Sequence, residues 1–197
     1  MGRLQDRITV VTGGSTGIGG ATCEMFAAEG AVSIVVDYNE TEGEGAAARI
    51  RDAGGRAEFH RLDVRCAEET AQVFERIGAD HGHIDVLVCS AGILMGAFHG
   101  IEDLEEEAWD ATIDTNLKGT YLTTKFAAPW LRKAERSVML LIASGAGVRG
   151  GSSSYAYAAS KAGMHGMQYN FASDLNTTRV HVICPGGIST PLKLLNI

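Results

Sequence analysis

The amino-acid sequence predicts an α/β protein in which a doubly wound parallel sheet is covered by helices on both faces, a three-layer α/β/α arrangement. The first observation is the alternation of short, continuously apolar runs with longer segments of helical pattern. The second is a glycine-rich segment, residues 13–19, between the first apolar run and the first helical segment. The third is that no low-complexity stretch divides the 197 residues, of which 45% are hydrophobic. One domain spanning residues 1–197 is therefore expected.

Six apolar runs of strand length are expected to form the sheet. They lie near residues 8–12, 32–37, 56–62, 86–89, 138–143 and 180–184. Runs without polar alternation are typical of parallel strands that are buried on both faces. Helical segments separate the runs, and the two longest helices are expected near residues 105–131 and 155–175.

The glycine-rich segment fits a turn that binds a dinucleotide. Residues 8–12 form the strand before it, and residues 21–29 continue as a helix after it. Glycines allow a tight turn and a close approach of the backbone to a pyrophosphate, which the N–H groups at the helix start can hold. Because an acidic residue, Asp37, closes the second strand, the pattern predicts a Rossmann-type sheet.

Asp37 also bears on the choice of dinucleotide. A carboxylate at this point would bind the adenosine ribose hydroxyls and repel a 2′-phosphate. No arginine or lysine occurs in residues 13–19 or directly after Asp37, where Tyr38 and Asn39 stand. The sequence therefore favours NAD over NADP.

The same glycine segment has a second interpretation. Residues 13–17, Gly-Gly-Ser-Thr-Gly, also fit the G-x-S-x-G nucleophile elbow of hydrolases. An elbow serine needs a downstream acid and a histidine, and the spacing favours neither His165 nor His181. The two further glycines fit phosphate binding better.

Three side chains near the end of the chain can form a proton donor for carbonyl chemistry. Lys161 follows Tyr157 by one helical turn, so its ammonium group can lie near the phenol. A free tyrosine titrates near pH ~10, and a neighbouring positive charge favours the phenolate. Ser144 follows a buried strand, at the edge where open α/β sheets bind ligands. The alternative interpretation of the Tyr-x-x-x-Lys spacing alone is an exposed polar pair.

Taken together, these motifs resemble the short-chain dehydrogenase/reductase family over nearly the whole chain. The residues that carry the resemblance are Thr12, Gly13, Gly17, Ile18, Gly19, Asn116, Ser144, Tyr157 and Lys161. The resemblance implies an NAD(P)-dependent oxidoreductase, active on a small-molecule secondary alcohol or ketone.

The resemblance also implies a role for each catalytic residue. Tyr157 would be the general acid/base, and Ser144 would polarise the substrate oxygen. Lys161 would lower the tyrosine pKa and bind the nicotinamide ribose, while Asn116 would hold a water that links Lys161 to solvent. The implied cofactor-binding residues are Gly13, Ser15, Thr16, Gly17, Ile18, Gly19, Asp37, Asp63, Val64, Ala91, Gly92, Tyr157, Lys161, Pro185, Gly186, Ile188 and Thr190.

The sequence departs from the family pattern at two points. Cys89 and Ser90 stand where the family usually has two asparagines that brace the sheet, so lower stability or a shifted loop is expected. Family members also run further beyond Thr190, so the last strand and the substrate lid are expected to be missing. A cofactor-binding but catalytically inactive, truncated interaction module is therefore the alternative function. The substrate stays unidentified at this point.

The family implies a homodimer or homotetramer, with the two longest helices at an interface. The apolar side chains available on them are Phe126, Trp130, Met164, Met167 and Phe171. The same side chains could instead belong to the core of one chain.

Charge and composition exclude several other functions. A net charge of −7 at pH 7 argues against nucleic acid and against an anionic membrane surface. The polar amino terminus and strand-length apolar runs predict no signal peptide or membrane span, hence a cytoplasmic protein. The four cysteines form no Cys-x-x-Cys pair and are expected to be buried thiols of a reducing compartment. Two histidines, His81 and His83, make too weak a set to predict a metal site.

Overall fold

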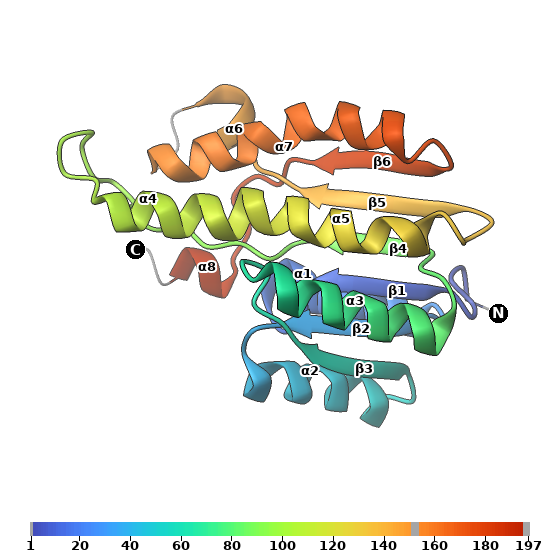
Figure 1. The fold of residues 1–197 in the computed structure, drawn as a ribbon. Coiled ribbons are helices and arrows are strands. Elements are labelled where there is room, and N and C mark those ends of the chain that lie inside the picture. Colours follow the sequence, from blue (N-terminus) through green and yellow to red (C-terminus); the bar gives the residue numbers. More distant parts are fainter. Residues whose placement is uncertain (1, 151–153, 195–197) are drawn as a thin grey trace.

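The computed structural model describes residues 2–150 and 154–194 and confirms the predicted parallel sheet (Figure 1). Its strands are β1 (Ile8–Thr12), β2 (Val32–Asp37), β3 (Arg56–Arg61), β4 (Val86–Cys89), β5 (Ser137–Ile142) and β6 (Thr178–Ile183). They lie in the order β3-β2-β1-β4-β5-β6, and every neighbouring pair is parallel. β6 begins earlier than predicted because Ser137 and Thr178 share a hydrogen bond of 2.7 Å across the β5–β6 pair.

The helices connect these strands. They are α1 (Gly17–Ala28), α2 (Glu40–Asp52), α3 (Ala67–His81), α4 (Glu106–Ile113), η1 (Asp114–Lys118), α5 (Gly119–Leu131), α6 (Ala146–Arg149), α7 (Tyr155–Asp174) and α8 (Pro191–Leu194). The single helix predicted over residues 105–131 is in fact interrupted by η1, which is a π-helix. A π turn admits an extra residue per turn, a feature that apolar periodicity alone does not mark.

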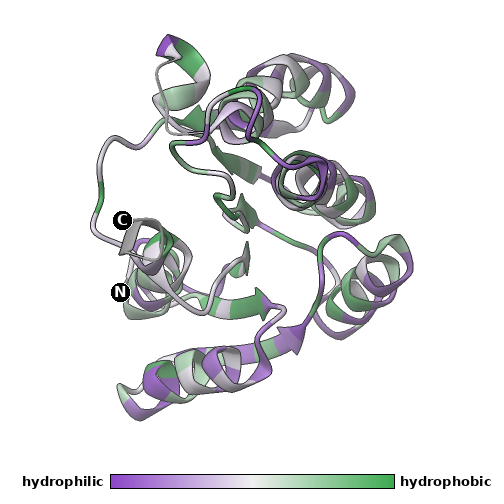
Figure 2. Ribbon diagram, turned by 90° about the vertical axis from the view of Figure 1, so that its left-hand side faces the viewer, coloured by the Kyte–Doolittle hydropathy of each residue, from purple (hydrophilic) through white to green (hydrophobic). Residues whose placement is uncertain are grey.

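Two hydrophobic cores hold the layers together. On one face of the sheet, α3, α5 and α7 pack through side chains such as Phe74, Leu131 and Met164. On the other face, α1 and α2 pack through Cys23 and Ile50. Figure 2 shows helices on both sides of the strands, as the predicted three-layer arrangement requires. Each apolar strand thus buries both its faces, which explains the lack of alternation in the sequence.

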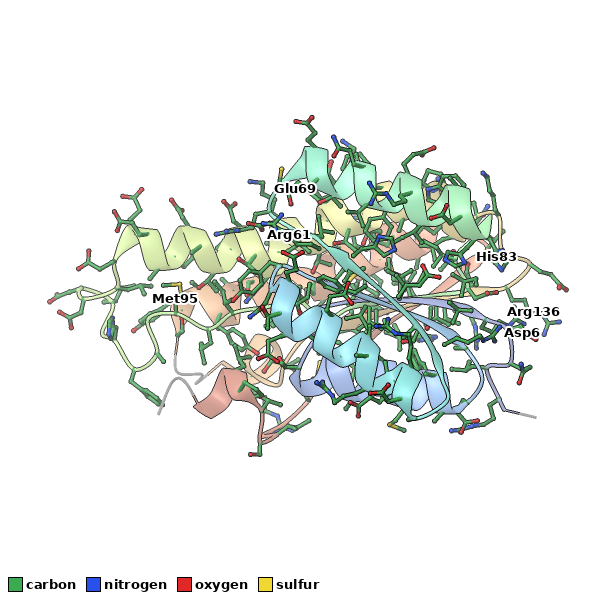
Figure 3. The ribbon with its side chains drawn as sticks, turned by 90° about the horizontal axis from the view of Figure 1, so that it is seen from below. Asp6, Arg61, Glu69, His83, Met95 and Arg136 are labelled. Carbon is green, nitrogen blue, oxygen red and sulfur yellow. The ribbon has the colours of Figure 1, made fainter. Side chains whose placement is uncertain are left out.

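The chain reverses its direction of travel across the sheet between β1 and β4, which are direct neighbours. In open α/β sheets, ligands bind outside the carboxyl ends of the strands at such a switch point. Met95, in the loop after β4, lies at this end of the molecule, opposite Asp6 and His83, which precede β1 and β4 (Figure 3). None of the helices in residues 2–150 and 154–194 has the length and hydropathy needed to cross a membrane.

Candidate active site

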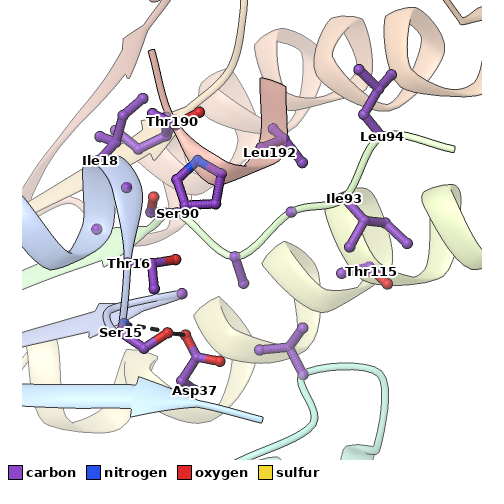
Figure 4. A pocket seen from close by; sticks show the side chains of 18 of the residues that line it. Ser15, Thr16, Ile18, Asp37, Ser90, Ile93, Leu94, Thr115, Thr190 and Leu192 are labelled. Carbon is purple, nitrogen blue, oxygen red and sulfur yellow. Dashed lines mark hydrogen bonds between the residues drawn. The ribbon is translucent and has the colours of Figure 1, made fainter. Parts of the chain in front are cut away.

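A cleft of about 670 Å³ opens at the carboxyl ends of the strands. The loops that follow all six strands contribute to its lining. Every catalytic or cofactor-binding residue predicted from the sequence lines this cleft, with the exception of Asn116. Figure 4 shows Ser15 and Asp37 on one side of the cleft and Ile93, Leu94 and Thr115 on the other.

The glycine turn after β1 has the close packing that the sequence predicts. Gly13 has φ +66°, a conformation that side-chain-bearing residues rarely adopt, and a Cβ there would lie 2.7 Å from the backbone of Ala91. A Cβ on Gly19 would overlap the carbonyl of Gly13. Gly17, with φ +56°, begins α1 and faces Thr190, which a Cβ would meet at 3.5 Å. The turn therefore presents bare backbone to the cleft, bordered by Thr190 from the far end of the chain.

The Asp37 carboxylate is fixed to the glycine turn. It is 8% exposed, and its Oδ2 accepts hydrogen bonds from the Ser15 hydroxyl at 2.5 Å and the Ser15 amide at 3.2 Å (Figure 4). Oδ1 accepts a hydrogen bond of 3.2 Å from the amide of Asn39. The turn and the end of β2 thus form one rigid unit. This arrangement also argues against the hydrolase elbow, because the Ser15 hydroxyl donates to a carboxylate, and the nearest partner of His165 is Cys184.

Asp63 and Arg65 line the cleft beyond β2 and form an ion pair. Arg65 Nη2 lies 2.6 Å from Asp63 Oδ2, and its Nε lies 2.9 Å from Oδ1. Hydrogen bonds from Arg65 lower the pKa of the Asp63 carboxyl. Arg65 was not predicted from the sequence. Its position two residues after the predicted site residue Asp63 could have indicated an ion pair with that carboxylate. Val64, between them, packs against α5, where a Cβ on Gly119 would lie 2.6 Å from its Cγ2.

Ser144, Tyr157 and Lys161 lie together in the cleft. Ser144 follows β5, whereas Tyr157 and Lys161 are on the first turns of α7. Ser154 caps this helix by accepting a hydrogen bond from the Tyr157 amide, and its hydroxyl donates to the Met95 carbonyl at 2.8 Å. The cap fixes the position of the first turn relative to the loop after β4.

Burial has the largest effect on the pKa values of Tyr157 and Lys161. It lowers the pKa of Lys161 to about 8, and the ammonium group donates a 2.8 Å hydrogen bond to the Ile142 carbonyl. Burial also raises the pKa of Tyr157, while a hydrogen bond with Ser144 acts in the opposite direction. A lowered Tyr157 pKa was expected from the sequence. In the structure the Tyr157 pKa is raised instead, because the phenol is largely removed from water and a buried charge is costly.

Asn116 is fully buried behind the cleft, on the π-helix. Its Oδ1 accepts a 2.8 Å hydrogen bond from the Ile93 amide, and its Nδ2 donates to the Ile93 carbonyl and to Ser160 Oγ, both at 3.0 Å. The side chain thus ties the loop after β4 to α7. Its predicted contact with a water stays a prediction. Gly92 is needed beside it, because a Cβ there would lie 3.2 Å from Asn116 Oδ1 and 3.4 Å from Lys161 Nζ.

The loop after β6 closes the cleft on its open side. Pro185, Gly186, Ile188 and Thr190 all line the cleft. The Pro185 carbonyl accepts a 3.2 Å hydrogen bond from the amide of Gly145, next to Ser144. This contact sets the loop after β6 beside the loop after β5.

Several lining residues were not singled out from the sequence. They are apolar residues of the loops after β4 and β6, chiefly Ile93, Leu94, Phe98 and Leu192. Apolar residues in a loop carry no recognisable pattern, so only the fold reveals that they share a wall with Tyr157. Phe98 is exceptional, because it combines φ +63° with an exposed fraction of 79%.

The cysteines and histidines set aside in the sequence form no second centre among the described residues. Burial raises the pKa of Cys23 and of Cys89 to about 12, so both thiols stay protonated near neutral pH. All four cysteines are free, and Cys184 is exposed rather than buried as predicted. No group of three or more metal-ligating side chains occurs within residues 2–150 and 154–194.

Comparisons with known proteins show the family to which the chain belongs. Residues 7–194 match the family model described as short chain dehydrogenase. The chain is 34% identical to a 3-oxoacyl-[acyl-carrier-protein] reductase from Thermotoga maritima over 192 residues, which are 96% of this chain and 77% of the relative. It is 34% identical to a cyclopentanol dehydrogenase from a Comamonas species over 194 residues, 98% of this chain and 77% of the relative.

A solved short-chain dehydrogenase from Shigella flexneri 2a, in complex with NADP, superposes with a TM-score of 0.92 at 29% identity, covering 98% of this chain and 82% of that one. The residues matched by the family model, 7–194, extend from β1 to α8. The glycine turn, Asn116, Ser144, Tyr157 and Lys161 all lie within this range. The chain belongs to the short-chain dehydrogenase/reductase family of oxidoreductases.

Proposed function

We propose that this oxidoreductase is NAD-dependent and acts on a secondary alcohol or ketone, with Tyr157 as its general acid/base. The observation that carries the proposal is the convergence of Ser144, Tyr157 and Lys161 on the cleft that the glycine turn borders. We further propose that residues 1–197 form one domain that contains both the cofactor site and the catalytic site.

The residues of the cleft fit a nicotinamide dinucleotide. Gly13 and Gly92 line the cleft without a side chain, and a Cβ would press on Ala91 or on Asn116, so the backbone itself is available to an extended ligand. The first N–H groups of α1 have no partner within the helix and can bind a pyrophosphate. Asp37 and Asp63 would hold the adenosine end, while Pro185, Ile188 and Thr190 would hold the nicotinamide end beside Ser144.

A nicotinamide dinucleotide held by these residues would supply the hydride chemistry, as acceptor from the alcohol carbon or donor to the ketone carbon. The protein moves the accompanying proton: in oxidation the Tyr157 phenolate takes the hydroxyl proton, and in reduction the phenol donates it. Ser144 donates a hydrogen bond to the substrate oxygen and thereby holds it within reach of Tyr157.

Lys161 would favour the phenolate through its charge. The ammonium nitrogen lies 5.5 Å from the centre of the Tyr157 ring. A positive charge at this distance in a partly desolvated site opposes the effect of burial on the tyrosine pKa. Because the pKa of Lys161 is about 8, the ammonium form predominates at neutral pH.

Two features of the adenosine end support NAD over NADP. Asp37 would repel a 2′-phosphate, and Arg65, the cation on this side of the cleft lining, is paired with Asp63. The Shigella flexneri relative was solved with NADP, so the preference needs a direct comparison. We expect a lower Kd for NAD, measured by titration calorimetry, and a similar or tighter Kd for NADP would contradict this part of the proposal.

We also propose that the protein is a homodimer or homotetramer. Phe126, Trp130, Met167 and Phe171 are only partly buried within the chain and remain available for an interface. Met164 is fully buried in the core of its own chain, so it cannot contribute. Light scattering on the purified protein would measure the assembly, and a monomer would contradict the proposal.

The experiment that tests the activity follows reduced dinucleotide spectroscopically with a panel of ketones and secondary alcohols. Turnover that is lost in Tyr157→Phe, with dinucleotide binding retained, is the expected result. Dinucleotide binding without turnover on any member of the panel would instead favour the inactive interaction module.

A further inference from the structure

We propose that the substrate is uncharged and has an apolar carbon skeleton, and that Phe98 is the residue that binds this skeleton. The inference rests on the proposed function, because it concerns the part of the cleft that contains Ser144 and Tyr157. It adds a substrate class and a specificity-determining residue to that function.

The charged side chains of the cleft are unevenly distributed. Four of the five that line it, Asp37, Glu42, Asp63 and Arg65, come from β2, α2 and the segment after β3. These elements lie on the far side of β1 from β4 in the sheet order. The fifth, Lys161, is 4% exposed and donates its hydrogen bond to the Ile142 carbonyl. A substrate carboxylate or phosphate would therefore find no free cationic partner among the described residues that line the cleft.

The part of the lining that comes from the segments after β4, β5 and β6 is mostly apolar instead. The loop after β4 supplies Ile93 and Leu94, and the segment after β6 supplies Leu192 (Figure 4) together with Ile188. A pocket of this composition gains affinity from apolar surface and leaves an unpaired charge at a disadvantage. The hydroxyls of Ser144 and Tyr157 are the polar groups in this wall that can meet one substrate oxygen.

Phe98 lies in the same loop and is held in an unusual conformation. Its φ of +63° is a rare backbone conformation for a bulky residue, and such outliers gather at binding sites. Phe98 lines the cleft and is nevertheless 79% exposed. Gly96, at φ +61°, bends the loop so closely that a Cβ would overlap Leu104. The loop is thus folded back on itself in a way that presents an aromatic face to a ligand.

The same loop carries negative charge further along the chain. Glu102, Asp103 and Glu105 are exposed and flank Leu104, which packs against Gly96. Their field disfavours an approaching anion at low ionic strength. The acidic loop and the apolar part of the lining thus select in the same direction, toward a neutral molecule.

A pair of substrates that differ by one carboxylate group tests the class. Initial rates are measured for cyclohexanol and for cis-4-hydroxycyclohexanecarboxylate, with whichever dinucleotide the protein binds more tightly. We expect kcat/KM to be at least about tenfold higher for cyclohexanol. Equal rates, or a preference for the carboxylate, would overturn the inference and leave the proposed function intact.

Two substitutions test Phe98, with a matched control. Phe98→Ala removes the ring, and Phe98→Gly also removes the backbone strain, so the glycine variant separates lost binding from a damaged fold. Both should lower kcat/KM for cyclohexanol roughly tenfold, mainly by raising KM, without changing the Kd for the dinucleotide. Tyr169→Ala removes an aromatic ring that is 74% exposed on α7, outside the cleft, and should leave all these values unchanged. Unchanged kcat/KM in both Phe98 variants would contradict the assignment.

Failure of the proposed function is distinguishable from failure of the inference. If neither alcohol is oxidised, the catalytic proposal fails, and ligand binding decides the inference on its own. Saturation-transfer NMR on the dinucleotide-loaded protein would compare cyclohexanone with 4-oxocyclohexanecarboxylate. Preferential binding of cyclohexanone that Phe98→Ala weakens supports the inference, and any other pattern overturns it.

Discussion

The ammonium group of Lys161 lies 5.5 Å from the centre of the Tyr157 ring and donates its hydrogen bond to the Ile142 carbonyl. The strand that positions Ser144 therefore also holds the charge that acts on Tyr157. Movement of β5 relative to α7 would disturb all three groups together, which makes their geometry a property of the sheet rather than of one helix.

Tyr157→Phe removes the acid/base and leaves the ring in place. We expect kcat to fall by about 10² to 10⁴, the usual contribution of a positioned proton donor, while the Kd for the dinucleotide changes little. Steady-state rates and calorimetric titration measure the two quantities. A variant that keeps the wild-type kcat would show that another group moves the proton. Tyr155→Phe, one of the two tyrosines of the same helix turn, serves as the control, because Tyr155 does not line the cleft.

Lys161 should make stability depend on pH. Its pKa is lowered from 10.5 to about 8, so between these values the unfolded chain binds more protons than the folded one, and stability rises with pH. The raised pKa values of Cys23 and Cys89 act in the opposite direction above their ordinary value of 9.0. The contribution of Lys161 is therefore measured as the difference in the free energy of unfolding between wild type and Lys161→Met, obtained from urea unfolding at each pH. We expect a difference on the order of 2 kcal/mol accumulated between pH 8 and pH 10.5, and parallel pH curves would refute a depressed lysine pKa.

Asp37→Ala should weaken NAD binding about tenfold, because the ribose hydroxyls would lose charge-assisted hydrogen bonds. The ratio of the Kd values for NADP and NAD should fall, since the negative charge that repels a 2′-phosphate is gone. Asp52→Ala, at the exposed end of α2, is the control. An unchanged ratio in the Asp37 variant would argue that cofactor choice is made elsewhere.

Gly13→Ala should destabilise the fold by about 2 kcal/mol or more, because it combines a positive φ with a Cβ only 2.7 Å from the Ala91 backbone. Gly54→Ala has φ +83° and open space, so it isolates the backbone strain. Gly166→Ala, in the interior of α7 with open space, should stabilise by up to about 1 kcal/mol. Urea unfolding of the three variants ranks them, and any other order would contradict the packing argument.

Asn116→Ala should cost about 2 to 3 kcal/mol, since it removes both hydrogen-bond partners of the half-buried Ile93 backbone groups. Asn116→Asp keeps the acceptor for the Ile93 amide but cannot donate to the Ile93 carbonyl, so we expect an intermediate loss. The two variants should lower kcat along with stability, because the loop after β4 lines the cleft. If both fold as stably as wild type, the side chain does not act as the tie described above.

The sequence predicted the parts of this molecule that have a period or a motif. Buried parallel strands reveal themselves as unbroken apolar runs, and Gly13, Asp37 and Tyr157 stand at fixed places relative to those strands. The π turn at Asp114–Lys118 escaped prediction because its residues remain compatible with a helix. Phe98 and Arg65 escaped because their positions depend on loop geometry and on one ion pair. The burial that raises the Tyr157 pKa also depends on side chains that meet only in the fold.

The π turn has a consequence for how this chain can be altered. In an α-helix, removing one residue rotates everything beyond it by about 100° relative to what precedes it. The extra residue in Asp114–Lys118 fixes the rotation of α5 about the helix axis relative to α4. With this rotation, Asn116 contacts Ile93 and Leu131 on α5 lies in the core. A deletion of one residue there would make the helix regular, but either the Asn116–Ile93 hydrogen bonds or the packing of Leu131 in the core would be lost. We therefore expect insertions and deletions to be harmful in Asp114–Lys118, although its residue types are all compatible with a regular α-helix.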